Sequence, residues 1–256
     1  MLVPMERHLT ILTGASRGLG LAMALQLLGP GQRLVTLARS RSDELESAAE
    51  KAGAALKQWP ADLADPLTVA DRLGEWLMGV DGSAFASATL INNAAALSEP
   101  APLADSASRG LSTSVRVGLE APLLLSATFL RATAHWPGRR QVLNISSGLG
   151  RRAMAGSTAY CAVKAGMDHF SRALALEEAA HPNGAKVVSL APGVIDTDMQ
   201  VQLRGADPKR FPERARFAEL HAQGLLDSPV QAAAKVLAYL ARPDFGHEVI
   251  ADVRDA

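Results

Sequence analysis

Residues 8–20 read HLTILTGASRGLG, a short apolar run that passes directly into a glycine-rich turn. The run predicts a buried strand over 8–14, and the segment from Leu19 to Leu28 predicts a helix. Gly14, Gly18 and Gly20 fall between the two, where glycine lets the backbone turn tightly and approach a diphosphate closely. The stretch therefore favours a dinucleotide-binding α/β unit. The alternative is a glycine-rich turn without a ligand, since the spacing G-x-x-x-G-x-G differs from G-x-G-x-x-G.

The alternation of apolar runs with amphipathic segments continues along the chain. Further strands are expected over 33–38, 55–60, 87–94, 141–147, 185–193 and 247–252, and helices over 42–52, 66–78, 105–134 (which Gly118 could interrupt), 158–181 and 229–241. This pattern predicts an α/β fold: a single doubly wound Rossmann-type domain over 1–256, with a mostly parallel sheet of about seven strands and helices on both faces. Residues 193–228 are the least regular, and 194–224 are expected to form a substrate-binding lid within the domain.

The composition excludes several classes of partner. The 256 residues are 48% hydrophobic and 20% charged, which suffices for a large core, and 26 basic residues balance 26 acidic ones. A neutral chain gives no electrostatic case for nucleic acid or an anionic membrane, and no apolar run is long enough to span a bilayer. The N-terminus does not resemble a signal peptide. One cysteine and histidines without ligand spacing predict no disulfide and no metal. We expect a cytoplasmic protein.

Two arginines indicate which dinucleotide would bind. Arg17 lies inside the glycine turn, and Arg39 directly follows the second predicted strand, where no carboxylate is found. NAD sites place an acidic residue there for the ribose 2′-hydroxyl, whereas an arginine suits the 2′-phosphate of NADP. The sequence therefore predicts NADP(H) over NAD(H). The alternative is that both arginines are solvated surface residues.

Polar and small residues follow the third and fourth predicted strands. Asp62 could accept a hydrogen bond from an adenine amino group, and Leu63 could pack on the ring. Asp65 precedes Pro66 and is better explained as the cap of a helix that begins at the proline. Asn92 and Asn93 end the fourth strand at the edge where open α/β sheets bind ligands.

Tyr160 and Lys164 are four residues apart on a predicted helix and therefore share one face. A nearby ammonium favours the phenolate and would lower the pKa of the tyrosine, which can also donate its proton to a carbonyl oxygen. Ser147, at the end of the preceding strand, could hydrogen-bond the same oxygen. Cys161 is rotated by about 100° from Tyr160 and need not share the active face.

Together, TGASRGLG, NNAA (92–95), Ser147, YCAVK (160–164) and PGVIDTDM (192–199) resemble the short-chain dehydrogenase/reductase family. The resemblance implies a hydride-transfer enzyme that uses a nicotinamide cofactor. It implies that Tyr160 is the acid/base, that Lys164 holds the nicotinamide ribose and lowers the pKa of the tyrosine, and that Ser147 orients the substrate carbonyl. Asn92 would help to hold the cofactor. The cofactor-binding residues implied are Gly14, Ser16, Arg17, Gly18, Leu19, Gly20, Arg39, Asp62, Leu63, Asn93, Ala94, Tyr160, Lys164, Pro192, Gly193, Val194 and Thr197.

The chain departs from the family pattern in three places. Ala95 replaces the usual last glycine of the Asn-Asn-Ala-Gly motif, a mild change. Gly118 stands where members often carry an asparagine that completes a proton relay, so water held by the backbone, or Ser114, would have to substitute. The C-terminal HEVIADVRDA lacks the Val-Asp-Gly-Gly-like ending of many tetrameric members. We therefore expect a homodimer through the helix over 158–181 and the one before it, with a tetramer as the alternative.

The substrate is expected to be a small carbonyl or alcohol compound. Ile195, Met199, Leu203, Phe211 and Phe217 suggest an apolar lid or, alternatively, ordinary helix packing, and Arg151 and Arg152 are expected to be a solvated pair. The C-terminus resembles that of sepiapterin- and benzil-reductase-like members, which favours an NADPH-dependent reductase of a dicarbonyl, bulky ketone or aldehyde. The alternatives are an alcohol or steroid dehydrogenase acting in the oxidising direction, and a non-catalytic NADP-sensing protein.

Overall fold

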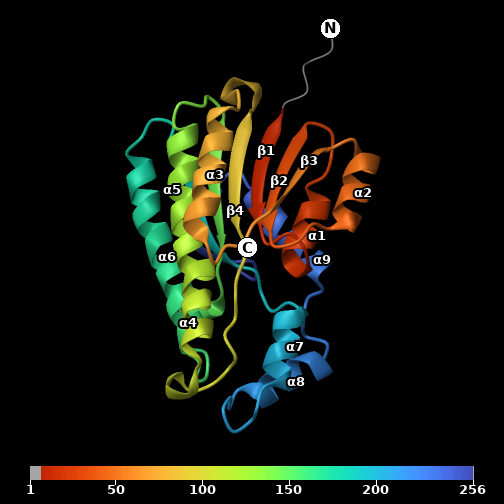
Figure 1. Cartoon of the computed structure of the whole chain (residues 1–256), viewed down its shortest axis with the longest axis vertical. Helices are drawn as coiled ribbons and strands as arrows, with labels where there is room; N and C mark the ends of the chain where they lie inside the picture. Colours follow the sequence, from red (N-terminus) through yellow and green to blue (C-terminus); the bar gives the residue numbers. More distant parts are fainter. Residues whose placement is uncertain (1–6, 256) are drawn as a thin grey trace.

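A computed structural model describes residues 7–255 of the chain (Figure 1). The predictions about the N-terminal leader and the ends of the domain fall partly on residues 1–6 and 256, which lie outside the described residues. The strands are β1 (His8–Thr13), β2 (Gln32–Ala38), β3 (Ala55–Pro60), β4 (Ser87–Asn92), β5 (Arg139–Ile145), β6 (Lys186–Ala191) and β7 (Ile250–Asp252). Each of the seven predicted strands is therefore confirmed, to within a few residues at its ends.

The strands form one sheet in the order β3-β2-β1-β4-β5-β6-β7, with every neighbouring pair parallel. This is the doubly wound Rossmann-type order that the alternating pattern predicted. The chain runs outward in one direction from β1 to β3 and in the other from β4 to β7. The switch point lies between β1 and β4, where such sheets bind ligands at the carboxyl ends of the strands.

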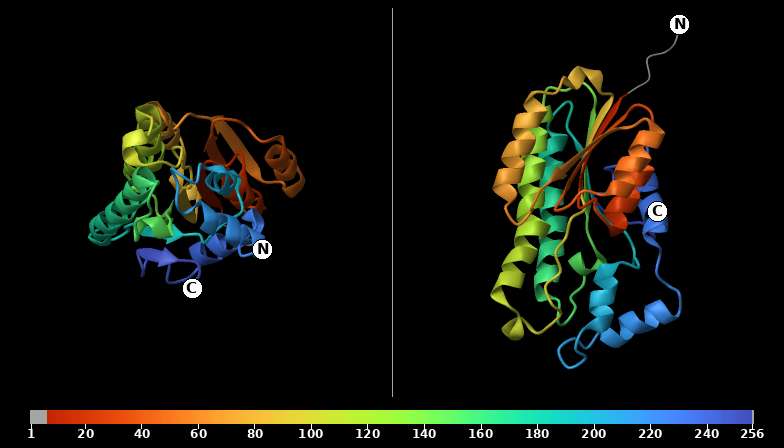
Figure 2. Two further views of the ribbon diagram at one scale, coloured as in Figure 1. Left: turned by 90° about the horizontal axis from the view of Figure 1, so that it is seen from below. Right: turned by 45° about the vertical axis from the view of Figure 1, so that its right-hand side comes forward.

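Helices cover both faces of the sheet (Figures 1 and 2). One apolar core lies between the sheet and α1, α2 and α9, and a second lies between the sheet and α3, α5 and α6. The helices are α1 (Gly18–Gln26), α2 (Asp43–Ala52), α3 (Pro66–Met78), α4 (Ser108–Val115), α5 (Ala121–Thr133), α6 (Thr158–Ala179), α7 (Asp198–Gly205), α8 (Arg214–Ala222) and α9 (Pro229–Leu240). No helix within residues 7–255 is both long and apolar enough to cross a membrane.

Local sequence signals fix several helix ends. Ser42 caps α2 by accepting a hydrogen bond from the backbone N–H of Leu45, and Gly53 ends the helix in the left-handed conformation. Pro66 begins α3 as predicted, but the Asp65 side chain accepts no hydrogen bond from the helix. Asp65 thus occupies the N-cap position as expected but makes no side-chain cap, and the fixed φ of the proline suits the first helical position.

The long helix expected over 105–134 is interrupted. A π-helical turn over Arg116–Glu120 separates α4 from α5 and contains Gly118. The possible break near this glycine is confirmed. Such wide turns insert an extra residue into the helical ladder and often lie near functional sites.

Residues 193–228 are more regular than expected. They contain α7 and α8, which lie beyond the carboxyl ends of the strands (Figures 1 and 2). The prediction of an irregular segment is wrong because these helices are short and carry no strong apolar stripe; α8 buries none of its residues. These helices are stabilised by a small separate core at Leu203 and Phe211 rather than by an apolar pattern visible in the sequence.

Candidate active site

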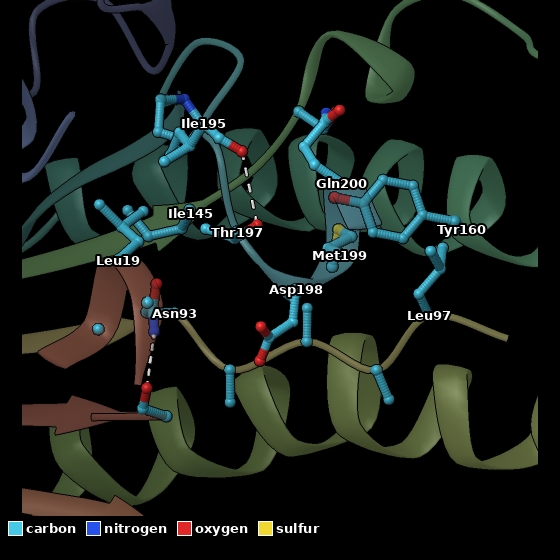
Figure 3. Close-up of a pocket in the computed structure, with 18 of the residues that line it drawn as sticks. Leu19, Asn93, Leu97, Ile145, Tyr160, Ile195, Thr197, Asp198, Met199 and Gln200 are labelled. Carbon is cyan, nitrogen blue, oxygen red and sulfur yellow. Dashed lines mark hydrogen bonds between the residues drawn. The ribbon is translucent and has the colours of Figure 1, made fainter. Parts of the chain in front are cut away.

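A cavity of about 880 Å³ opens at the carboxyl ends of the strands and extends under α7 and α8. Figure 3 shows Leu19 and Asn93 at one end of it and Tyr160 and Leu97 at the other. With the exception of Asn92, the structure brings together in its lining the residues predicted for cofactor binding or catalysis: Gly14, Ser16, Arg17, Gly18, Leu19, Gly20, Arg39, Asp62, Leu63, Asn93, Ala94, Ser147, Tyr160, Lys164, Pro192, Gly193, Val194 and Thr197.

The glycine turn has the geometry that close contact with a diphosphate needs. Gly14 and Gly18 have φ of +73° and +56°, values that favour glycine. A Cβ at Gly20 would lie 2.1 Å from the carbonyl oxygen of Gly14, so only glycine allows so tight a turn. At the start of α1, Arg17 supplies no side-chain cap. The first N–H groups of this helix are therefore free to bind an anion in the cavity.

Asn93 and Asn92 have different surroundings. Asn93 lines the cavity, and its side-chain amide donates to the carbonyl oxygen of Thr13 at 2.9 Å, which holds the β4 end against the glycine turn. Asn92 is buried behind it and donates to Ser126 and Asn144. Asn92 does not line the cavity, because successive residues of a strand point to opposite faces, so it could help to hold the cofactor only indirectly, by fixing the end of β4.

The two arginines expected at the ribose end both line the cavity. Arg39 is exposed and forms no ion pair with a described carboxylate, whereas Arg17 Nη1 lies 2.8 Å from Asp198 Oδ2 at the start of α7. Asp62 and Leu63 also face the cavity, and one Asp62 oxygen accepts from the backbone N–H of Ala64. At this end Arg39 is thus available to an anion, whereas Arg17 links the glycine turn to α7.

Tyr160 and Lys164 lie one turn apart on α6 and face the cavity with Ser147. Lys164 is buried, its Nζ donates to the carbonyl oxygen of Ile145 at 2.6 Å, and it lies 5.6 Å from the centre of the Tyr160 ring. Burial lowers the pKa of Lys164 to about 8, against the opposing effect of the Asp168 charge.

Burial dominates the pKa of Tyr160. Burial raises it to about 12, and a hydrogen bond with the Ser147 side chain works in the opposite direction without overcoming the burial. The net pKa of Tyr160 is thus above that of a free tyrosine, and the lowering expected from the Lys164 charge stays a prediction. The tyrosine is a phenol at neutral pH, the form that can donate a proton.

Neither Gly118, where the relay asparagine is missing, nor its candidate substitute Ser114 lines the cavity. Gly118 is buried against α6, and a Cβ there would lie 2.5 Å from Cγ1 of Val163. Ser114 is buried and donates to the carbonyl oxygen of Ala96 at 2.8 Å. The Ser114 hydroxyl is therefore already engaged with the backbone, which disfavours it as a substitute for the asparagine.

The apolar residues after Gly193 serve two purposes. Ile195, Met199 and Phe217 face the cavity, Phe211 is buried in the small core below it, and Leu203 belongs to both. Ordinary packing thus accounts for Phe211 and part of Leu203, and the apolar lid stays a prediction for the residues that face the cavity. Cys161 is half-buried against the same small core and is not among the residues that line the cavity.

Sequence reasoning did not single out Arg216 and Arg254, and it named Arg152 only as a solvated residue. Arg152, Arg216 and Arg254 line the cavity, while Arg151 turns inward to Asp168 and Asp252. Arg151 and Arg152 are both exposed as expected, but Arg151 also pairs with two buried carboxylates. Its partners lie far away in the chain, so no local pattern could reveal them. Within residues 7–255, no three His, Cys, Asp or Glu side chains gather in a way that could hold a metal ion.

A sequence model of the short chain dehydrogenases matches residues 8–207. The chain belongs to this family. Among curated relatives, this chain is similar to the benzil reductase ((S)-benzoin forming) of Bacillus cereus. The two are 34% identical over 235 residues, which cover 92% of this chain and 94% of the relative. The sepiapterin reductase of Rattus norvegicus is 32% identical over 249 residues, covering 92% of each chain.

The short-chain dehydrogenase fold is also found among solved structures. A dehydrogenase from Agrobacterium tumefaciens, determined with bound NADP, has a TM-score of 0.78 and 25% sequence identity. The similarity covers 97% of this chain and 95% of the other. Family and fold agree in making this chain an oxidoreductase of the short-chain dehydrogenase family.

Proposed function

We propose that this short-chain dehydrogenase is an NADPH-dependent reductase of carbonyl compounds, with a bulky ketone or dicarbonyl as the preferred substrate class. The observation that carries the proposal is the convergence of Ser147, Tyr160 and Lys164 on one cavity with the glycine turn. The similarity to enzymes named benzil reductase and sepiapterin reductase supports the direction of the reaction and the size of the substrate.

The residues of the cavity fit a phosphorylated dinucleotide. The glycine turn and the uncapped start of α1 suit the diphosphate, and the unpaired Arg39 suits a 2′-phosphate. Asp62 and Leu63 would hold the adenine, and Lys164, Pro192, Gly193, Val194 and Thr197 would hold the nicotinamide half. When bound, the reduced nicotinamide supplies a hydride to the carbonyl carbon.

The chain itself supplies the proton and the orientation. The Ser147 hydroxyl would hydrogen-bond the carbonyl oxygen and support its developing negative charge. Tyr160, a phenol at neutral pH, would transfer its proton to that oxygen, so that the carbonyl becomes an alcohol. The Lys164 ammonium, one turn away, would stabilise the resulting phenolate until solvent returns a proton.

The apolar floor of the cavity supports a bulky substrate. Leu97 and Met199 lie near Tyr160, and Phe217 and Leu220 also line the cavity. Residues 194–224, which contain α7 and α8, would form the lid. Apolar walls with a few convergent polar groups are typical of sites for aromatic or branched small molecules.

A screen of NADPH consumption tests the proposal. Diketones, aldehydes, quinones, pteridines and acyl thioesters are offered with NADPH and, in parallel, with NADH. We expect turnover of at least one bulky ketone or diketone, with higher kcat/KM for NADPH. If no compound is turned over while NADPH binds tightly, the proposal is wrong and the NADP-sensing alternative is favoured, although both Tyr160 and Lys164 are present in the cavity.

A further inference from the structure

Helix α6 contacts the end of β5 through three successive turns. Tyr160, Lys164 and Asp168 are spaced by four residues and share one face of the helix. In this order, their side chains hydrogen-bond the Ser147 side chain, the Ile145 carbonyl oxygen and the Ser146 side chain. Three consecutive residues of the strand end are thus held by three consecutive turns of the helix. The first two turns carry residues of the proposed catalytic site, and the third carries Asp168, which is outside the proposed catalytic set.

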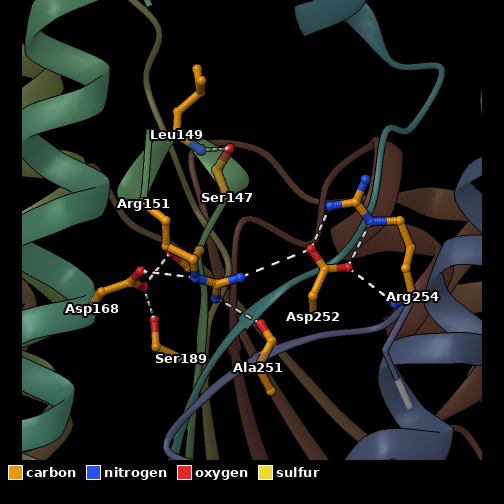
Figure 4. Close-up of polar contacts among 9 residues, drawn as sticks. Ser147, Leu149, Arg151, Asp168, Ser189, Ala251, Asp252 and Arg254 are labelled. Atoms are coloured by element: carbon orange, nitrogen blue, oxygen red, sulfur yellow. Dashed lines mark hydrogen bonds and ion pairs between the residues drawn. The ribbon is translucent and has the colours of Figure 1, made fainter. Parts of the chain in front are cut away.

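Asp168 is a buried carboxylate in a built environment. It is 2% exposed, and its Oδ1 accepts from Ser146 at 2.6 Å and from Ser189 at 2.7 Å (Figure 4). Its Oδ2 accepts no hydrogen bond from residues 7–255 and lies 3.5 Å from Arg151 Nε. A Cβ at Gly150 would lie 2.7 Å from the same oxygen, so the turn after Ser147 packs directly on the carboxylate.

Arg151 connects this carboxylate to the last strand. It donates to the carbonyl oxygen of Ala251 at 2.7 Å and lies 3.9 Å from Asp252, which is buried and paired with Arg254 (Figure 4). The guanidinium therefore bridges two buried carboxylates, one on α6 and one on β7. Arg254 itself lines the cavity.

Charged and titratable groups around the Lys164–Asp168 face come from several elements. Helix α6 contributes Tyr160 and the buried Asp168, the turn after β5 contributes the exposed Arg151, and β7 contributes the buried Asp252 behind Arg151. Strand β6 contributes the uncharged Ser189, and the charged side chains of α4 and the π-helical turn, Arg109, Arg116 and Glu120, are not buried. Among these, Asp168 is the carboxylate that favours the charged form of Lys164. A negative charge one helical turn away in a water-poor site is more effective than the same charge on the surface.

We propose that Asp168 is a positioning residue of the active site: it orients the β5 end beside Ser147 and supplies the negative charge that keeps Lys164 an ammonium. Arg151 moderates this charge. The expected effect of Asp168 on turnover rests on the proposed function, whereas its expected effect on the protonation of Lys164 does not. Since the side chain of Asp168 is buried behind Ser146, it acts through its neighbours and is not expected to touch the substrate.

The test is a pH titration of the Lys164 ammonium in the free protein by nitrogen-15 NMR, with its resonance assigned by its loss in Lys164→Met. Asp168→Asn keeps the size of the side chain and removes the charge. We expect the pKa of Lys164 to fall by about one unit in this variant. We expect Arg151→Gln to raise the pKa of Lys164, because the negative charge of Asp168 is then no longer partly neutralised by the guanidinium. Glu177→Gln, which removes an exposed carboxylate from the same helix, should leave it unchanged.

Turnover provides a second readout. The alkaline limb of kcat/KM for reduction should move to lower pH in Asp168→Asn and to higher pH in Arg151→Gln. An unchanged Lys164 titration in folded Asp168→Asn overturns the inference, as does a shift equal to that of Glu177→Gln. If Asp168→Asn does not fold, Arg151→Gln decides: a raised pKa supports the inference, and an unchanged or lowered pKa overturns it. If no carbonyl is reduced by the wild type, the proposed function fails while the NMR result still stands.

Discussion

Gly118 and Val163 lie so close together that a Cβ at position 118 would come within 2.5 Å of Val163 Cγ1. Gly118 sits in the π-helical turn before α5, and Val163 immediately precedes Lys164 on α6. This contact therefore sets how closely the two helices approach beside the catalytic lysine. The residue that the family resemblance places here, an asparagine, has no room in this chain.

Gly118→Asn should consequently destabilise the protein rather than restore a relay. We expect the free energy of unfolding to fall by about 1–3 kcal/mol, because the new side chain overpacks a buried contact between two helices. Chemical denaturation measures this. Val163→Ala in the same background should recover part of the loss, and a double-mutant cycle without coupling would argue against the contact as its cause.

Arg39→Asp should reverse the cofactor preference. Loss of a charge-assisted contact with a 2′-phosphate, together with a new repulsion, should lower kcat/KM for NADPH by about 10–100-fold while NADH is affected little. Steady-state kinetics with both cofactors measures the effect. Arg41→Asp is the matched control, since Arg41 is exposed and is not among the residues that line the cavity. Equal preference in Arg39→Asp and wild type would show that this arginine does not select the cofactor.

Much of the fold could be predicted because parallel strands buried on both faces are continuous apolar runs, as in residues 8–13. The core of the site could be predicted because Tyr160 and Lys164 are neighbours on one helix. Helices α7 and α8 could not be predicted, because their formation depends on the packing of Phe211 rather than on an apolar pattern in their own sequences. The inward turn of Arg151 and the burial of Asp168 also depend on partners that only the folded chain brings together.

The lid offers a matched pair of aromatic residues. Phe217 faces the cavity and stacks on Phe211, with ring centres 5.8 Å apart, whereas Phe211 is fully buried. Phe211→Ala should cost about 3–5 kcal/mol of local or global stability, because it leaves a cavity in the small core. Phe217→Ala should instead raise KM for bulky ketones with little change in the melting temperature. A loss of stability in Phe217→Ala together with a raised KM in a stable Phe211→Ala would contradict the proposed lid.

Stability should depend on pH through Lys164. Burial lowers the pKa of Lys164 from 10.5 to about 8. Between these values the unfolded chain binds a proton that the folded chain lacks, so the free energy of unfolding rises with pH. The difference between wild type and Lys164→Met should therefore increase by about 3 kcal/mol across this window, with no change from this group below it. Urea unfolding at a series of pH values measures it, and parallel curves for the two proteins would refute the burial of a titrating ammonium.

The central claim is that this chain reduces a carbonyl with Tyr160 as the proton donor. The most direct measurement compares NADPH oxidation by wild type and Tyr160→Phe in the presence of a diketone such as benzil, with NADPH binding followed by fluorescence as the control for a folded site. The account predicts that Tyr160→Phe binds NADPH normally and loses at least about 100-fold in kcat. Reduction by Tyr160→Phe at the wild-type rate would contradict it.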